Sequence, residues 1–128
     1  GKIRIFDVEK AKLIKEIKSP HLNKSNGVKE TSYIKSEITD LEYCFNGKRL
    51  ISGDSLKYLC LYDVDKDYNL IRLLPNSLAS FGSLCISHDF KYASIIGPND
   101  YIISVFDASN LNECLRINTL TNLSTNLG

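Results

Sequence analysis

A short pattern of apolar and polar positions occurs three times along the chain, at residues 3–8, 59–64 and 103–108. Each copy reads apolar, variable, apolar, aromatic, Asp and then a small apolar residue. Alternation of this kind is typical of a β-strand that turns one face to a core. A polar turn and a second short strand follow each copy, and the second strands share two apolar residues followed by a base: Leu13-Ile14-Lys15, Leu70-Ile71-Arg72 and Cys114-Leu115-Arg116. The pattern therefore predicts three antiparallel strand pairs and no helix.

The second and third copies are also preceded by similar sequences. Residues 38–53 and 83–97 each contain two apolar runs separated by a polar turn. In the first of these, Asn46-Gly47 is a strong hairpin signal, because both residues accept the positive φ of a tight turn. Asp89-Phe90 takes that place in the second, and Phe disfavours positive φ. We therefore expect the second turn to be of a different type.

These motifs resemble the WD40 repeat family, whose pattern is an apolar first strand, a Ser-Pro-Asp-Gly-Lys turn, Leu-x-Ser-Gly and a strand that ends in Trp-Asp. The second unit carries most of the resemblance, with these residues at the family positions: Ile38, Leu41, Tyr43, Asn46, Gly47, Lys48, Leu50, Ser52, Gly53, Tyr62 and Asp63. Phe6-Asp7 and Phe106-Asp107 stand at the Trp-Asp position of the other units. The chain departs from the family because it has no Trp and no Gly-His pair. We therefore do not expect the polar network that braces a standard blade.

The resemblance implies an all-β fold, a partial β-propeller of about two and a half four-stranded antiparallel WD40-like blades. A blade takes roughly 40–45 residues, whereas Asp7, Asp63 and Asp107 are 56 and 44 residues apart. The surplus lies in the polar stretch 19–36, which we interpret as an enlarged loop. The expected parts are the end of one blade (1–18), this inserted loop (19–36), a second repeat (37–80), a third repeat (81–118) and a tail (119–128). A ring needs about four blades or more, so we expect a segment of a longer protein, or a ring closed with another chain.

The sequence offers little chemistry for catalysis. It contains two histidines, His21 in the long stretch and His88 in a predicted turn. The run Ser87-His88-Asp89 is not expected to be a catalytic triad, because neighbouring side chains on extended backbone point to opposite faces. We therefore expect no catalytic residues here and no enzyme activity.

Neither the aspartates nor the cysteines complete a metal-binding motif. Asp63, Asp65 and Asp67 have the spacing of a calcium loop, but the glycine and the final Glu of such a loop are missing. The four cysteines include no Cys-x-x-Cys pair, which is the usual arrangement at a zinc site. We expect free thiols, no metal and no cofactor.

Composition favours a protein-binding role. The net charge of +1 gives no overall attraction to nucleic acid or membranes, and no apolar run approaches the roughly 20 residues that cross a bilayer. We expect a non-catalytic protein-interaction scaffold in the cytoplasm. The expected partner-binding residues lie in the basic stretch 19–36 and in loops at one end of the blades: Lys24, Lys29, Lys35, Ser55, Lys57, Asn99 and Asp100.

A second resemblance, carried by residues 58–63, 69–74, 96–101 and 108–111, is to large WD-repeat proteins of centrioles and cilia. It implies tubulin or microtubule-associated proteins as partners and a cytoskeletal, ciliary or centriolar location. Two alternatives stay open. One is a propeller enzyme whose site lies in blades outside this chain. The other is nucleic-acid binding through the lysines of 19–36, which predicts salt-sensitive affinity.

Overall fold

The computed structural model describes residues 1–18, 37–56, 58–74, 83–96, 102–118 and 123–126. These residues form eleven β-strands and one short 3₁₀-helix: β1 (Lys2–Asp7), β2 (Lys12–Lys18), β3 (Ile38–Cys44), β4 (Arg49–Asp54), β5 (Leu59–Asp63), η2 (Val64–Lys66), β6 (Asn69–Leu74), β7 (Ser83–Ile86), β8 (Tyr92–Ile96), β9 (Ile102–Asp107), β10 (Glu113–Asn118) and β11 (Leu123–Asn126). Among them no helix has the length and apolar character to cross a bilayer. The predicted loop 19–36 lies outside the described residues.

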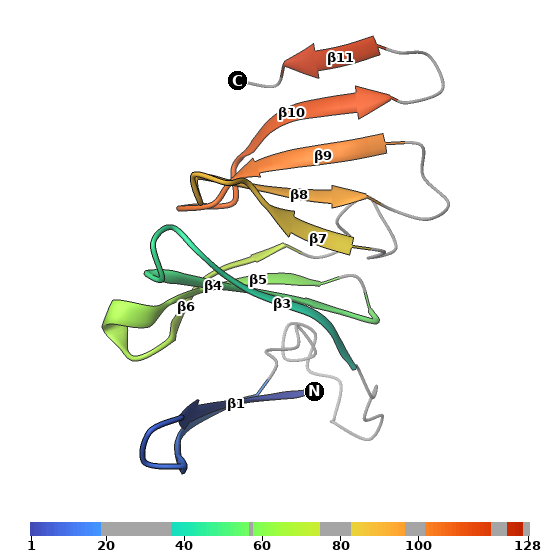
Figure 1. The fold of residues 1–128 in the computed structure, drawn as a ribbon. Helices are drawn as coiled ribbons and strands as arrows, with labels where there is room; N and C mark the ends of the chain where they lie inside the picture. Colours follow the sequence, from blue (N-terminus) through green and yellow to red (C-terminus); the bar gives the residue numbers. More distant parts are fainter. Residues whose placement is uncertain (19–36, 57, 75–82, 97–101, 119–122, 127–128) are drawn as a thin grey trace.

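The strands form three antiparallel sheets, as the repeat pattern predicts. Sheet 1 is β1–β2, sheet 2 is β3–β4–β5–β6, and sheet 3 is β7–β8–β9–β10 with β11 added at its outer edge. Figure 1 shows the sheets following one another, with sheet 2 between the other two. The all-β, propeller-like expectation is confirmed: half a blade is followed by two four-stranded ones, and the last carries one further strand.

The aromatic-Asp motif builds the same turn three times. Each Asp carboxylate accepts a hydrogen bond from a backbone N–H of the turn: Asp7 from Lys10 at 3.0 Å, Asp63 from Asp65 at 3.2 Å and Asp107 from Ser109 at 2.8 Å. The residue four positions after each Asp is left-handed, with φ of 52° at Ala11, 56° at Asp67 and 59° at Leu111. A left-handed residue other than glycine costs about 1–2 kcal/mol, which the bonds to the Asp offset.

A β-bulge also recurs at one point in each strand pair. The register shifts at Ile5/Phe6, at Leu61/Tyr62 and at Glu113/Leu115. Because a bulge places two residues opposite one, the extra residues are Ile14, Ile71 and Cys114. The predicted alignment of the third unit is therefore wrong by one position. Leu115 rather than Arg116 takes the place of the base, and Arg116 pairs instead with Glu113 of its own strand at 2.8 Å.

The turn between β3 and β4 and the turn between β7 and β8 differ in type, but not for the expected reason. Phe90 does adopt a left-handed φ of 62°, and Phe45 has a φ of 51°. Hydrogen bonds hold both residues, since Phe90 N donates to Ser87 O and Phe45 N donates to Phe90 O, each at 2.9 Å. The expectation that Phe avoids this conformation is wrong, because one hydrogen bond within the turn and one between the sheets outweigh the local preference.

The core consists of two apolar clusters, one on each face of sheet 2. Strand β5 is buried along its whole length, because its side chains alternate between two covered faces. Leu50, Cys60 and Tyr62 pack with Ile3 and Ile17 of sheet 1. The opposite face packs against sheet 3 and contributes Cys44, Ile51, Leu59 and Leu61, which meet Leu84, Ala93, Ile95, Phe106, Ala108 and Leu111.

The aromatic residue of the repeat fills the space between sheets wherever a preceding sheet covers it. Tyr62 and Phe106 are 1% and 5% exposed, whereas Phe6 is 57% exposed. Tyr62 packs toward sheet 1 and Phe106 toward sheet 2. No described sheet covers the equivalent face of sheet 1, so the same motif position is buried twice and exposed once.

The four thiols are free in the structure and differ in exposure. Cys44 and Cys60 are buried and Cys85 is exposed. Burial raises the pKa of the Cys44 and Cys60 thiols to about 11. Both thiols therefore stay protonated near neutral pH. Their contribution to stability is complete below the ordinary thiol pKa of 9.0 and is lost as the pH rises through about 11.

We expect iodoacetamide at about pH 8 to modify Cys85 in the folded protein and to leave Cys44 and Cys60 unmodified, because the thiolate is the reactive species. Peptide mass spectrometry of the alkylated protein measures this. Alkylation in urea is the control, in which all the cysteines react. Rapid modification of Cys44 or Cys60 without denaturant would contradict their burial.

Candidate interaction surface

Five of the described hairpin turns gather along one rim of the three sheets. The turns after β1, β3, β5, β7 and β9 lie at the left in Figure 1. Antiparallel hairpins joined in sequence place every second turn at the same end. Because the sheets lie side by side, this rim presents polar turn residues from three repeats next to one another.

Most of the predicted partner-binding residues lie outside the described ranges, namely Lys24, Lys29, Lys35, Lys57, Asn99 and Asp100. Ser55 is described and exposed. Its backbone N–H donates to Glu37 O at 2.9 Å, and its hydroxyl accepts from Glu37 N at 3.0 Å. Ser55 therefore fixes the start of β3 beside the turn after β4, and its role in partner binding stays a prediction.

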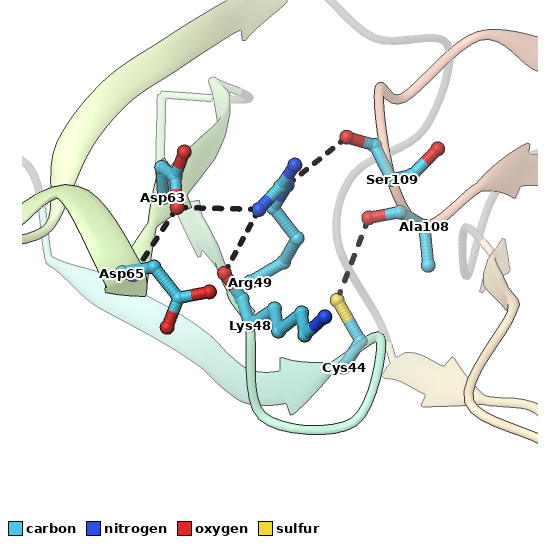
Figure 2. Close-up of polar contacts among 7 residues, drawn as sticks. All are labelled: Cys44, Lys48, Arg49, Asp63, Asp65, Ala108 and Ser109. Atoms are coloured by element: carbon cyan, nitrogen blue, oxygen red, sulfur yellow. Dashed lines mark hydrogen bonds and ion pairs between the residues drawn. The ribbon is translucent and has the colours of Figure 1, made fainter.

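Arg49 connects sheets 2 and 3 at the rim (Figure 2). Its Nη1 lies 3.3 Å from Asp63 Oδ1, and its Nε donates to Ser109 O at 3.2 Å in the neighbouring sheet. The guanidinium also lies 5.4 Å from the centre of the Phe45 ring. The Arg49 and Asp63 side chains are 19% and 13% exposed, so water screens the pair weakly. The Cys44 thiol adds a contact to Ala108 O at 3.7 Å.

In the first two repeats, the basic residue of the second strand of each aromatic-Asp strand pair contacts the next sheet. Arg72 of β6 donates to Asn110 O at 3.2 Å and also bonds the Asn112 side chain. Lys15 of β2 pairs with Asp67 at 2.9 Å. Lys15 and Arg72 occupy the same place after the bulge, so each connects its own sheet to the turn that follows the Asp of the next.

The boundary between sheets 1 and 2 contains a cavity of about 410 Å³ at the rim. Its lining comes from β2, from β5, from the end of η2 and from the turn and strand start that follow it: Lys15, Ile17, Lys18, Tyr62, Lys66, Asp67, Tyr68, Asn69 and Leu70. Tyr68 is held in place because its hydroxyl lies 2.7 Å from the Tyr43 hydroxyl. We call this the lysine-lined cavity. It differs from the boundary between sheets 2 and 3, where Arg49 occupies the rim.

The residues of the Ser-His-Asp run and of the aspartate pattern form hydrogen bonds and ion pairs that stabilise turns. The Ser87 hydroxyl donates to Asp89 Oδ1 at 2.6 Å, and Lys91 N donates to the same oxygen at 3.1 Å. These bonds lower the pKa of the Asp89 carboxyl, so it stays ionised, and His88 is exposed. Asp63 and Asp67 pair with different bases, Arg49 and Lys15. Within the described residues, no group of three or more potential ligands gathers for a metal.

Sequence reasoning missed Arg49, the cross-sheet role of Lys15 and Arg72, and the cavity. The base that follows two apolar residues was a usable signal for Lys15 and Arg72. Arg49 lies two residues after Gly47 of the Asn46-Gly47 turn, but its partner Ser109 is 60 residues away. No local pattern reports a contact across that separation.

Comparison with known proteins gives two relatives, and no family model matches the chain. WD repeat-containing protein 90 of Xenopus tropicalis is 28% identical over 123 residues, which is 91% of this chain and 6% of that protein. Periodic tryptophan protein 2 of Saccharomyces cerevisiae is 30% identical over 91 residues, which is 66% of this chain and 10% of that protein. The chain thus matches a tenth or less of each relative's length.

Proposed function

We propose that this chain, whose divergent repeats are of the WD40 type, acts as a non-catalytic protein-interaction scaffold within a larger WD-repeat protein. Both relatives are named for WD or tryptophan repeats. The observation that carries the proposal is the row of repeated turns on one rim (Figure 1). Their carboxylates are engaged by backbone N–H groups and by Arg49, which makes the rim a rigid surface suited to recognition.

We further propose that the partner surface is acidic and belongs to microtubules, in agreement with the resemblance to centriolar and ciliary WD-repeat proteins. Residues 1–18 carry six Lys or Arg against three Asp or Glu, and residues 19–36 carry three against one. The rest of the chain has the opposite balance. A basic N-terminal part, residues 1–36, on a nearly neutral chain favours attraction to an acidic partner through that part.

Co-sedimentation with polymerised tubulin tests this proposal. We expect the chain to pellet with microtubules, and we expect pelleting to weaken on raising the salt concentration, since exposed charges are screened. A variant with Lys24, Lys29 and Lys35 each replaced by Glu is expected to pellet severalfold less. Arg116→Glu, on β10 of sheet 3 away from the rim and outside residues 19–36, is the control.

No pelleting above background with tubulin in excess would overturn the microtubule proposal. Equal pelleting of the triple variant and the parent protein would show that the lysines of residues 19–36 do not contribute to binding. Tighter binding to single-stranded DNA than to microtubules would favour nucleic acid over a protein partner.

A further inference from the structure

The lysine-lined cavity is an open site on the basic part of the molecule. It lies where β2 of sheet 1 meets the start of β6 in sheet 2. Lys15 pairs with Asp67, whose side chain is 82% exposed. Lys18 and Lys66 are exposed and form no ion pair with any residue that the structure describes. Two cations therefore face solvent at the cavity without a described counter-charge.

The rest of the cavity lining offers apolar surface to the side chains of a bound peptide. Ile17, Leu70 and the Tyr68 ring supply apolar surface beside the lysines. Leu70 is 37% exposed, so apolar area remains to be covered. A cavity that combines apolar surface with a few charged groups fits a peptide better than a small inorganic anion, because the apolar side chains of a peptide can cover that surface.

The third repeat shows how an extended chain can occupy the equivalent edge. Strand β10 corresponds to β6, because both follow the same turn and carry the same bulge. The outer edge of β10 pairs with β11 through residues 115–118. Strand β6 is the last strand of sheet 2, so its outer edge has no strand beside it among the described residues. Edges of this kind accept a further strand from another chain.

We propose that the lysine-lined cavity and the outer edge of β6 bind an acidic, extended segment of a protein partner. The segment adds antiparallel to β6, as β11 adds to β10, and its carboxylates meet Lys18 and Lys66. This deepens the scaffold function proposed above and rests on it only in taking the partner to be a protein. It does not require the partner to be a microtubule.

Fluorescence anisotropy of the full chain with a fluorescein-labelled peptide of alternating Glu and Thr tests the site. We expect saturable binding that weakens as salt is added. The variant K18E/K66E is expected to bind about tenfold more weakly, because two favourable charge contacts become repulsive. R116E, a charge reversal on β10 away from both the cavity and the rim, is the control and has no expected effect on peptide binding. Far-UV circular dichroism verifies that each variant is folded, and K18Q/K66Q serves if the reversed charges disturb the fold.

Three further probes separate the alternatives. A peptide of alternating Gln and Thr is expected to bind at least several times more weakly, and equal binding would overturn the role of charge. The Glu-Thr peptide methylated on alternate backbone nitrogens cannot pair with a strand edge, and undiminished binding would overturn strand addition. Oligo-dT that competes better than the peptide would overturn the protein segment as ligand.

The results also separate this site from the microtubule proposal. Peptide binding that K18E/K66E weakens, without microtubule pelleting, would uphold the cavity and reject the microtubule partner. Pelleting with microtubules without any peptide binding would uphold the microtubule partner and reject the cavity as a peptide site. Unchanged peptide affinity in K18E/K66E would overturn the cavity whatever the microtubule result.

Discussion

Replacing Tyr62 with alanine is expected to lower the free energy of unfolding by about 3–5 kcal/mol, the usual cost of emptying a large buried aromatic site. Tyr62 is 1% exposed and packs between sheets 1 and 2. Phe6 occupies the same position of the repeat and is 57% exposed, so Phe6→Ala is the matched control and should cost less than about 1 kcal/mol. Urea unfolding followed by circular dichroism measures both variants.

Tyr62→Phe separates packing from hydrogen bonding at this position. Ser52 and Cys60 lie near the Tyr62 hydroxyl, but no described group forms a hydrogen bond with it. An unpaired buried hydroxyl stabilises the fold little or not at all. The free energy of unfolding of Tyr62→Phe should therefore stay within about 1 kcal/mol of that of the parent protein. Equal losses in Tyr62→Ala and Phe6→Ala would contradict the difference in burial. A large loss in Tyr62→Phe would show that the hydroxyl is bonded.

Replacing Arg49 with alanine is expected to cost about 2–3 kcal/mol, because it leaves the Asp63 carboxylate poorly compensated and removes a charged hydrogen bond between sheets. Arg49 lies 3.3 Å from Asp63 and 3.2 Å from Ser109 O (Figure 2). Urea unfolding again gives the difference in free energy, and hydrogen exchange of the turn at 108–112 reports whether sheets 2 and 3 separate locally.

Arg4→Ala is the control for Arg49→Ala. Arg4 pairs with Glu16 within sheet 1, and its side chain is 57% exposed, so the loss should stay under about 1 kcal/mol. An Arg49→Ala variant as stable as Arg4→Ala would show that the contact between sheets contributes nothing. Faster exchange at 108–112 in Arg49→Ala alone would support the assigned role.

The repeat itself was predictable because its causes are local. Alternating apolar residues in β1, β5 and β9 fix strands with one or two buried faces. The Asp that ends each of these strands fixes the following turn, since its carboxylate accepts a backbone N–H two or three residues later. These effects act within a few residues, and the sequence therefore determined the all-β architecture, the three aromatic-Asp strands and the hairpin that follows each.

Burial and partners were decided by the tertiary structure. Phe6, Tyr62 and Phe106 are equivalent in sequence, yet only the two with a sheet in front of them are buried. The Phe90 turn shows the same dependence, because a hydrogen bond from Phe45 in sheet 2 holds a conformation that Phe disfavours locally.

The candidate site depended still more on long-range packing. Arg49 and Ser109 are 60 residues apart in the chain, and the lysine-lined cavity joins β2 to residues 66–70. The spacing of lysines in the sequence indicates charge, but the meeting of two sheets decides which lysines share a cavity. The sequence determined the strands and turns because local sterics and hydrogen bonds suffice for them. Only the packing of one sheet against the next decided what is covered, what is open and which residues meet.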